Sequence, residues 1–278
     1  MIIVVLGVLG LIFGSFVNAF TWRLHEQAAL RGKKTKAATK RLAALSITKG
    51  RSMCASCGHE LAPRDLVPVL SWLWLRGRCR YCHAAIPDSP LVELATSVLF
   101  VVSYVAWPLG LNGVGLFQFV LWLVFVVAFV ALAVYDLRWF LLPDRVVLPL
   151  IGLAVVQIIV VALWTHSLSA LWQPVAGAGI IFGLFWGLFQ VSDGKWIGGG
   201  DVKLAAVLGL LAGTPLKAFL VIFFASLLGT VASVPILLKG RSGLKLHIPF
   251  GPYLLLATVI VVLYGTVAVS WYENLLRM

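Results

Sequence analysis

Several stretches of about 20 apolar residues follow one another along this chain, and each is long enough to cross a bilayer as an α-helix. Apolar residues make up 61% of the 278 residues and charged residues only 12%, which is too little charge for a soluble domain of this length. The sequence therefore predicts an all-α polytopic membrane protein with about eight transmembrane helices. The predicted spans are 1–22, 91–108, 115–136, 145–165, 172–192, 202–213, 216–238 and 249–272.

The first span does not have the pattern of a cleavable signal peptide. No basic residue precedes its apolar run, and that run is longer than the usual ~7–15 residues. We therefore interpret residues 1–22 as a retained transmembrane helix.

The basic residues predict the topology. Thirteen of the 22 Lys and Arg residues lie between Arg23 and Arg80, in one polar segment. Because cytoplasmic loops of membrane proteins collect basic residues, this segment is expected in the cytosol, with both chain termini outside. The loops near 137–144, 193–201 and 239–248 are then cytosolic as well, and among the basic residues only Lys217 and Arg277 fall on the other side. The net charge of +12 is thus a topology signal, and no aromatic stripe in the basic segment indicates nucleic-acid binding.

Four cysteines in the polar segment predict a metal site. Cys54 and Cys57 form one CxxC pair, Cys79 and Cys82 form a second, and 21 residues separate the two pairs. Four thiolates in a reducing compartment suit tetrahedral zinc, and a site with four protein ligands folds its loop rather than catalysing. His59 or His83 could replace one thiolate, and a redox role for one pair is the alternative.

The polar segment, residues 23–90, is therefore predicted to hold a small zinc-binding cytosolic domain at about 51–90. Residues 25–50 are basic and partly Ala-rich. They fit either a surface helix against anionic lipid or a mobile, solvated loop.

The predicted span 202–213 is too short for the membrane. About 12 helical residues rise only ~18 Å, against a hydrocarbon core of about 30 Å. The helix must tilt, lie in a thinned bilayer, or begin inside the protein at a water-filled recess.

Carboxylates at the ends of spans are candidates for function because such groups are costly at membrane depth. Four of the ten acidic residues lie at predicted cytosolic ends of spans: Asp136, Asp144, Asp193 and Asp201. Interfacial solvation or ion pairing with nearby Arg or Lys residues is the structural alternative.

Asp136 and Asp201 are the candidate catalytic pair. Two facing carboxylates can split a peptide bond without a metal, one activating water while the other polarises the carbonyl. Asp201 is predicted at a helix N-terminus and Asp136 at a C-terminus, so the helix dipoles favour the charge on Asp201. Asp144 is the rival second carboxylate, although its setting also fits a helix N-cap.

Glycines are expected in two roles. Gly198, Gly199 and Gly200 precede Asp201, where backbone freedom could admit an extended peptide substrate. Glycines at helix-packing spacing predict close helix contacts. They are Gly10 and Gly14 in the first span, and Gly179, Gly183 and Gly187 in the fifth.

Several motifs resemble the bifunctional prepilin peptidases, also called type IV leader peptidases, over nearly the whole chain. They are GSFVNAFTWRL (14–24), the stretch 51–94 with CGHEL, DLVPVLSWL, LRGRCRYC and PLVEL, then DLRWFLLPD, GGGDVKL and IPFGPY (248–253). Gly198 to Asp201 also resembles the GxGD pattern of intramembrane aspartic proteases. His83 departs from the resemblance, which would place a glycine there.

The resemblance implies a multi-pass aspartic endopeptidase of the bacterial inner membrane, with Asp136 and Asp201 catalytic in a peptidase domain at 91–278. It implies cleavage of leader peptides from type IV prepilins and pseudopilins at the cytosolic face. It also implies N-methylation of the new N-terminus with S-adenosylmethionine, by the N-terminal portion and cytosolic domain. Asn18 and Glu93 are candidates by resemblance alone, with helix packing or capping as the alternative.

Two other classes of function fit part of this pattern. A transporter could use Asp136, Asp144 and Asp201 as an ion path, but all three are predicted at one membrane face, whereas a path has to cross. A scaffold that binds partners through the zinc loop leaves the paired aspartates unexplained.

Overall fold

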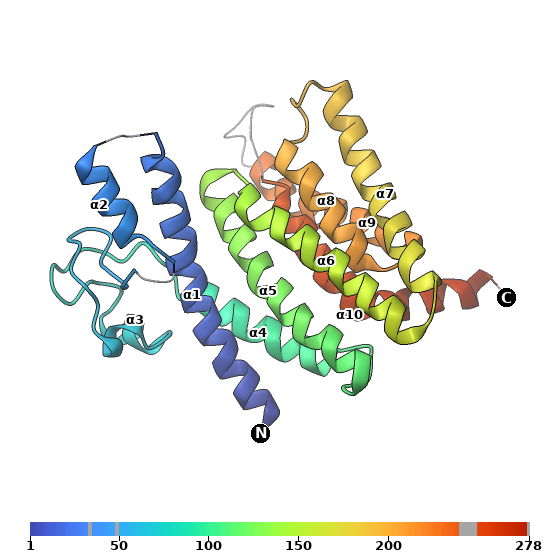
Figure 1. Cartoon of the computed structure of the whole chain (residues 1–278), viewed down its shortest axis with the longest axis horizontal. Helices are drawn as coiled ribbons and strands as arrows, with labels where there is room; N and C mark the ends of the chain where they lie inside the picture. Colours follow the sequence, from blue (N-terminus) through green and yellow to red (C-terminus); the bar gives the residue numbers. More distant parts are fainter. Residues whose placement is uncertain (33–34, 48–49, 239–248, 277–278) are drawn as a thin grey trace. The chain divides into compact units, whose positions relative to one another are not determined.

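The computed structural model describes residues 1–32, 35–47, 50–238 and 249–276. In this part of the chain every regular element is a helix, and strand pairing is limited to two isolated bridges, so the all-α prediction is confirmed. The chain divides into two compact units, Met1–Val105 and Ala106–Met278, which we call the first and second units (Figure 1).

In the first unit, two apolar helices pack against each other and a polar loop connects them. Its helices are α1 (Ile2–Leu30), α2 (Lys36–Ala44), η1 (Pro63–Leu66), α3 (Leu70–Trp74) and α4 (Leu91–Val105). The resemblance places residues 91–105 in the peptidase domain, whereas in the structure they group with α1 in the first unit.

The basic segment after α1 contains a helix. α2 is capped by the Thr35 hydroxyl, which accepts from the Ala38 N–H, and Gln27 of α1 donates to the Leu45 carbonyl just after α2 at 2.8 Å. Leu45 is only 1% exposed. Residues 36–44 therefore form a helix, and the segment that ends at Leu45 packs on the protein. The prediction of a mobile, solvated loop is wrong for these residues.

Glycines allow α1 and α4 to approach closely. A Cβ added at Gly10 would lie 2.5 Å from Ser97 Cα, and one at Gly14 would lie 2.5 Å from Glu93 Cα. The Ser97 hydroxyl donates to the Gly7 carbonyl at 2.9 Å across the same contact. The predicted packing role is thus found for Gly10 and Gly14.

The same prediction is wrong for the fifth span. A Cβ at Gly179, Gly183 or Gly187 meets nothing within 4 Å among the described residues. Glycines with the same spacing therefore do not all pack closely, because a close contact also requires a neighbouring helix at that position.

We expect Gly14→Ala to destabilise the first unit by about 1–3 kcal/mol, since the methyl group meets backbone that cannot move away locally. The matched change Gly183→Ala should leave stability unchanged or raise it by up to about 1 kcal/mol, because alanine favours the helix. Unfolding titrations of both variants in mixed micelles measure this. Equal stabilities of the two variants would contradict the close α1–α4 contact.

The described residues of the second unit form a bundle of six helices with a short helix at its centre. They are α5 (Gly113–Trp139), α6 (Asp144–Thr165), α7 (Ser169–Val191), α8 (Gly199–Ala212), α9 (Pro215–Leu238) and α10 (Gly251–Leu276). α8 contacts α6, α7, α9 and α10 (Figure 1). Leu204, Ala205, Val207 and Leu208 of α8 are fully buried.

Among the described residues, six helices are long and apolar enough to cross a membrane: α1, α5, α6, α7, α9 and α10. α4, with 15 residues, and α8, with 14, are shorter, so the predicted count of eight spans is not confirmed. Helix contacts explain the short α8, since a helix enclosed by other helices does not have to match the bilayer thickness itself.

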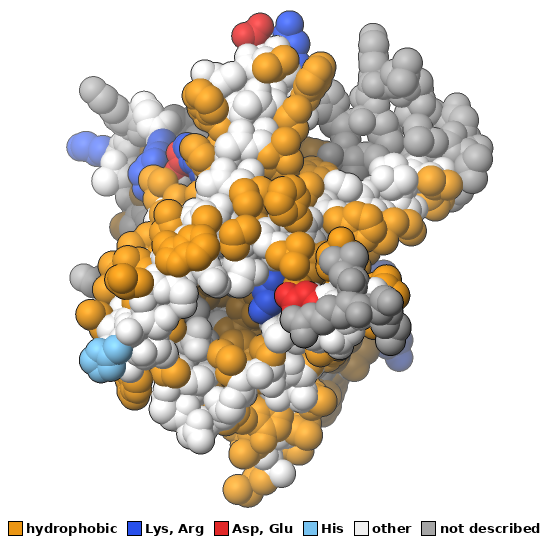
Figure 2. All heavy atoms as spheres, turned by 90° about the vertical axis from the view of Figure 1, so that its right-hand side faces the viewer, with side chains coloured by type: hydrophobic (Ala, Val, Ile, Leu, Met, Phe, Trp, Pro, Cys, Tyr) orange, Lys and Arg blue, Asp and Glu red, His pale blue; other side chains and the backbone are white. Residues whose placement is uncertain are grey.

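The outer surface of the helices suits lipid. Large apolar side chains such as Leu163, Phe219 and Phe223 are more than half exposed. Figure 2 shows hydrophobic side chains spread over the face in view, with few charged groups among them. A surface of this kind needs a bilayer around it, so the chain is a multi-pass membrane protein.

Candidate active site and metal centre

Asp136 lies near the C-terminal end of α5 and is 6% exposed. The helix ends three residues later because Phe140 adopts a left-handed conformation, with φ of 54°. The Phe140 N–H then donates to the Asp136 carbonyl at 2.8 Å, which closes the last turn. The side chain of Asp136 accepts a hydrogen bond from the backbone N–H of Gly251.

Asp201 is the third residue of α8, whose N-cap is Gly198. Its carboxylate accepts a hydrogen bond from the Gly198 N–H, as an acidic residue in the first turn commonly does. Its other oxygen, Oδ1, is buried without a hydrogen-bond partner among the described residues. One oxygen of Asp201 is thus left for a further ligand or proton.

Gly251, the first residue of α10, lies beside both carboxylates. A Cβ added there would be 2.5 Å from Asp136 Oδ2 and 3.7 Å from Asp201 Oδ1. Both distances start at the same point, so Asp136 Oδ2 and Asp201 Oδ1 lie no more than about 6 Å apart. Two residues 65 positions apart in sequence are therefore neighbours in the second unit, close enough for their charges to interact.

Sequence reasoning did not select Gly251 as a site residue, although IPFGPY was among the motifs that carried the resemblance. Its importance depends on where α10 begins relative to α5 and α8, which spacing alone does not give. The N-terminus of α10 also supplies a donor to Asp136, so helix ends face both aspartates. The dipole argument for a charge on Asp201 alone is correspondingly weaker.

We expect Gly251→Ala to lower peptidase activity about a hundredfold, because the methyl group would displace the Asp136 carboxylate by a large part of an ångström. Gly187→Ala is the control, since a Cβ there meets nothing within 4 Å among the described residues. Cleavage rates of a leader-bearing substrate by both purified variants measure the effect. Full activity of Gly251→Ala would show that the tight approach is unimportant.

The three glycines before Asp201 do not provide unusual backbone angles. Gly198 has φ of −71° and ψ of 145°, and Gly199 and Gly200 begin the helix. The prediction that these glycines are needed for their backbone angles is therefore wrong. Gly200 is needed for lack of space, because a Cβ there would lie 2.9 Å from Leu142 Cβ.

Asp144 is engaged elsewhere. Both of its oxygens accept from Lys203 Nζ at 2.8 Å, and Asp144 is the first residue of α6 rather than its N-cap, which is Pro143. Asp144 thus forms the ion pair that the sequence offered as the alternative to a catalytic role. The pair joins α6 to α8 two residues beyond Asp201.

The four cysteines of the first unit meet in one cluster. The Sγ atoms of Cys54, Cys57, Cys79 and Cys82 all lie within 4.8 Å of one another. The two pairs lie in matching turns. The Gly58 N–H donates to the Cys54 carbonyl, and the His83 N–H donates to the Cys79 carbonyl. His83 has φ of 58°, where Gly58 has 71°, so the histidine adopts the conformation that a glycine would favour.

This geometry fits a tetrahedral ion. Four sulfurs at about 2.3 Å from a central zinc would lie ~3.8 Å apart. The Cys54 and Cys82 sulfurs are 3.8 Å apart. Neither histidine belongs to the cluster, and the His59 ring instead lies 3.7 Å from that of Tyr81. Four thiolates are thus positioned to hold a metal ion.

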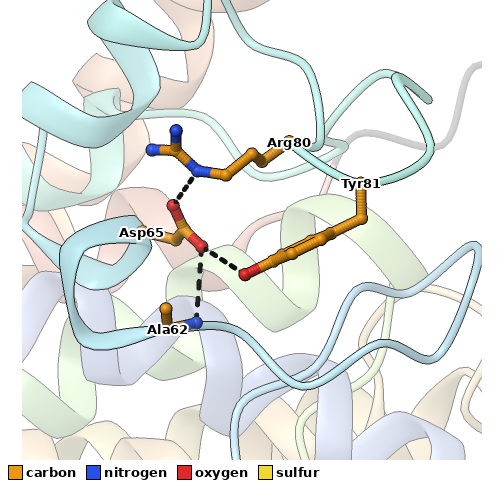
Figure 3. Close-up of polar contacts among 4 residues, drawn as sticks. All are labelled: Ala62, Asp65, Arg80 and Tyr81. Carbon is orange, nitrogen blue, oxygen red and sulfur yellow. Dashed lines mark hydrogen bonds and ion pairs between the residues drawn. The ribbon is translucent and has the colours of Figure 1, made fainter.

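An ion pair beside the cluster supports the loop (Figure 3). Asp65 accepts from Arg80 Nε at 2.7 Å, from the Tyr81 hydroxyl at 3.2 Å and from the Ala62 N–H at 3.3 Å. Burial would raise the pKa of Asp65, but the hydrogen bond and charge of Arg80, with Tyr81 and Ala62, outweigh it and hold the pKa below its usual value. The pair therefore stabilises the loop above the unfolded aspartate pKa, and this contribution is lost as the pH falls through the lower, folded pKa.

A bundle of apolar helices with two neighbouring carboxylates, Asp136 buried and Asp201 partly buried, is the arrangement expected of a membrane peptidase. Residues 8–107 match the family model for the bacterial peptidase A24 N-terminal domain, and residues 123–234 match that for the type IV leader peptidase family. The chain belongs to the type IV leader peptidase family.

Relatives match over most of their length. The chain is 34% identical to the prepilin leader peptidase/N-methyltransferase of Stutzerimonas stutzeri, over 98% of this chain and 93% of the relative. It is 35% identical to that of Pseudomonas aeruginosa, over 92% and 88%, and 31% identical to that of Bacillus subtilis, over 82% and 87%. No solved structure gives a significant match.

Proposed function

We propose that this chain removes leader peptides from type IV prepilins and pseudopilins, with Asp136 and Asp201 as its catalytic pair. The observation that carries the proposal is the position of both carboxylates beside Gly251. Family membership and the names of the relatives support the substrate class.

In this mechanism the two aspartates share one proton. The ionised carboxylate takes a proton from a water molecule, and the resulting oxygen nucleophile attacks the scissile carbonyl carbon. The protonated carboxyl donates to the carbonyl oxygen as negative charge develops there. The nitrogen of the breaking bond then receives a proton, which releases the leader and a new N-terminal amine.

The metal site has a separate role. Cys54, Cys57, Cys79 and Cys82 would hold Zn²⁺ with no ligand position left open, so the ion would fix the loop and take no part in hydrolysis. The proposed topology places this loop and the aspartates on the cytosolic side of the inner membrane, with both termini outside. The proposed domains are the first helix at 1–22, the cytosolic loop at 23–90 and the peptidase at 91–278.

The new amine would then be methylated with S-adenosylmethionine. The relatives carry both activities in their names, and the match to the N-terminal family model covers residues 8–107. Cleavage supplies the amine that the second reaction needs, so one chain can perform both steps in order.

The test uses purified full-length protein in detergent and a prepilin with an intact leader. We expect cleavage just before the apolar helix of the substrate, and transfer of label from S-adenosylmethionine to the shortened product. An uncut prepilin would contradict the proposal and favour a transporter or a scaffold.

A further inference from the structure

The first unit contains a cavity that the proteolytic mechanism does not use. Its volume is about 470 Å³, within the range of small-ligand sites. Residues of α1, the polar loop and the start of α4 line it. Asn18, Trp72 and Glu93 among them carry the inference.

Two polar atoms of lining residues are buried without partners among the described residues. They are Asn18 Oδ1, an acceptor, and Trp72 Nε1, a donor. Asn18 is only 6% exposed, and its Nδ2 donates to the Ser89 carbonyl at 3.4 Å, which holds the amide in place. Since a buried polar atom without a partner is costly, the pair indicates a ligand that offers both a donor and an acceptor.

Glu93 is a buried carboxylate held in a defined position. It is 8% exposed, and its Oε2 accepts from the Val69 N–H at 2.5 Å. The Ser15 side chain also hydrogen-bonds to it. Val69 has φ of 60°, a strained conformation for a β-branched residue. Strain of this kind is found where a site requires a particular geometry.

Aromatic side chains complete the lining. Phe16, Trp22 and Trp72 lie around the cavity. Their faces suit a flat heterocycle and also a cationic centre, which aromatic rings attract. The lining thus suits a ligand with a flat ring such as adenine, hydrogen-bonding groups and a positively charged sulfur.

We propose that this cavity binds S-adenosylmethionine and that Glu93 accepts the proton of the amine to be methylated. The inference rests on the second step of the proposed function. The substrate ammonium gives a proton to the Glu93 carboxylate, and the nitrogen lone pair forms a bond to the methyl carbon. The sulfur–carbon bond breaks with its electron pair left on sulfur, which gives neutral S-adenosylhomocysteine and a methylated ammonium.

The test compares Glu93→Gln, Glu93→Asp and Asn18→Ala with the control Glu26→Gln, a partly exposed α1 residue that pairs with Arg41 outside the cavity lining. Binding of labelled S-adenosylmethionine and the rates of cleavage and methylation are measured on the same preparations. We expect Glu93→Gln to lower the kcat of methylation about a hundredfold or more with little change in KM for the cofactor. Glu93→Asp should recover part of this rate, and Asn18→Ala should weaken cofactor binding at least about tenfold.

The outcomes are distinguishable. If wild-type protein cleaves but does not bind S-adenosylmethionine, or if both Glu93 variants methylate normally, the inference is overturned and the peptidase stands. If cleavage falls as much as methylation in the Glu93 variants, and a basic leader peptide competes for the cavity, the cavity is a leader site. If wild-type protein does not cleave, the proposed function fails, and binding by Asn18→Ala still tests the cavity.

Discussion

Asp136→Asn and Asp201→Asn should each lower the rate of leader cleavage by about a thousandfold or more. Asparagine keeps the shape of the side chain but cannot take a proton from water or share one with the other residue. The proposed mechanism makes the two carboxylates act as a unit, so the double variant should be little slower than either single one. Single-turnover cleavage of a purified prepilin measures all three rates.

Asp144→Asn is the matched control for this series. Its carboxylate is paired with Lys203 and is half exposed, so we expect cleavage within a few-fold of wild type. A thousandfold loss in Asp144→Asn, together with normal cleavage by Asp136→Asn, would show that Asp144 and not Asp136 is the catalytic partner of Asp201.

Cys79→Ser should remove the metal ion and unfold the loop around it. Cys79 is 4% exposed and its sulfur belongs to the cluster of four. Structural zinc sites contribute on the order of 10 kcal/mol to folding, and three thiolates in an open site retain only part of this. We expect metal content to fall from about one ion per chain to nearly none, with rapid proteolysis between residues 50 and 90.

His59→Ala is the comparison for the metal site. It lies next to the first CxxC turn but contacts Tyr81 instead of joining the sulfur cluster. Its metal content should equal that of wild type. Loss of the ion in His59→Ala but not in Cys79→Ser would contradict the four-thiolate site.

The helices and the gathering of the four cysteines could be predicted from residue pattern. Long apolar runs give helices whatever they pack against, and two CxxC pairs have few other uses in a reducing compartment. The surroundings of α8 could not be predicted, because its burial comes from four other helices. This burial explains how residues 202–213 can form a helix that is shorter than the bilayer is thick.

Close approaches were the other feature that pattern could not give. Gly14 and Gly183 have the same spacing signals, but only Gly14 meets a partner backbone. Gly251 is important because α10 begins beside Asp136 and Asp201, which is a consequence of packing in the second unit. At His83, the structure explains an unexpected residue, since histidine adopts the left-handed angle of the corresponding Gly58.

The central claim is that the carboxylates of Asp136 and Asp201 lie beside Gly251 and share one site. The most direct measurement is oxidative cross-linking of the D136C/D201C double variant in membranes, with the joined peptides identified by mass spectrometry. The account predicts a disulfide between positions 136 and 201 in high yield, while G187C/D201C gives none. No bond between 136 and 201, even with a short bifunctional thiol reagent, would contradict it.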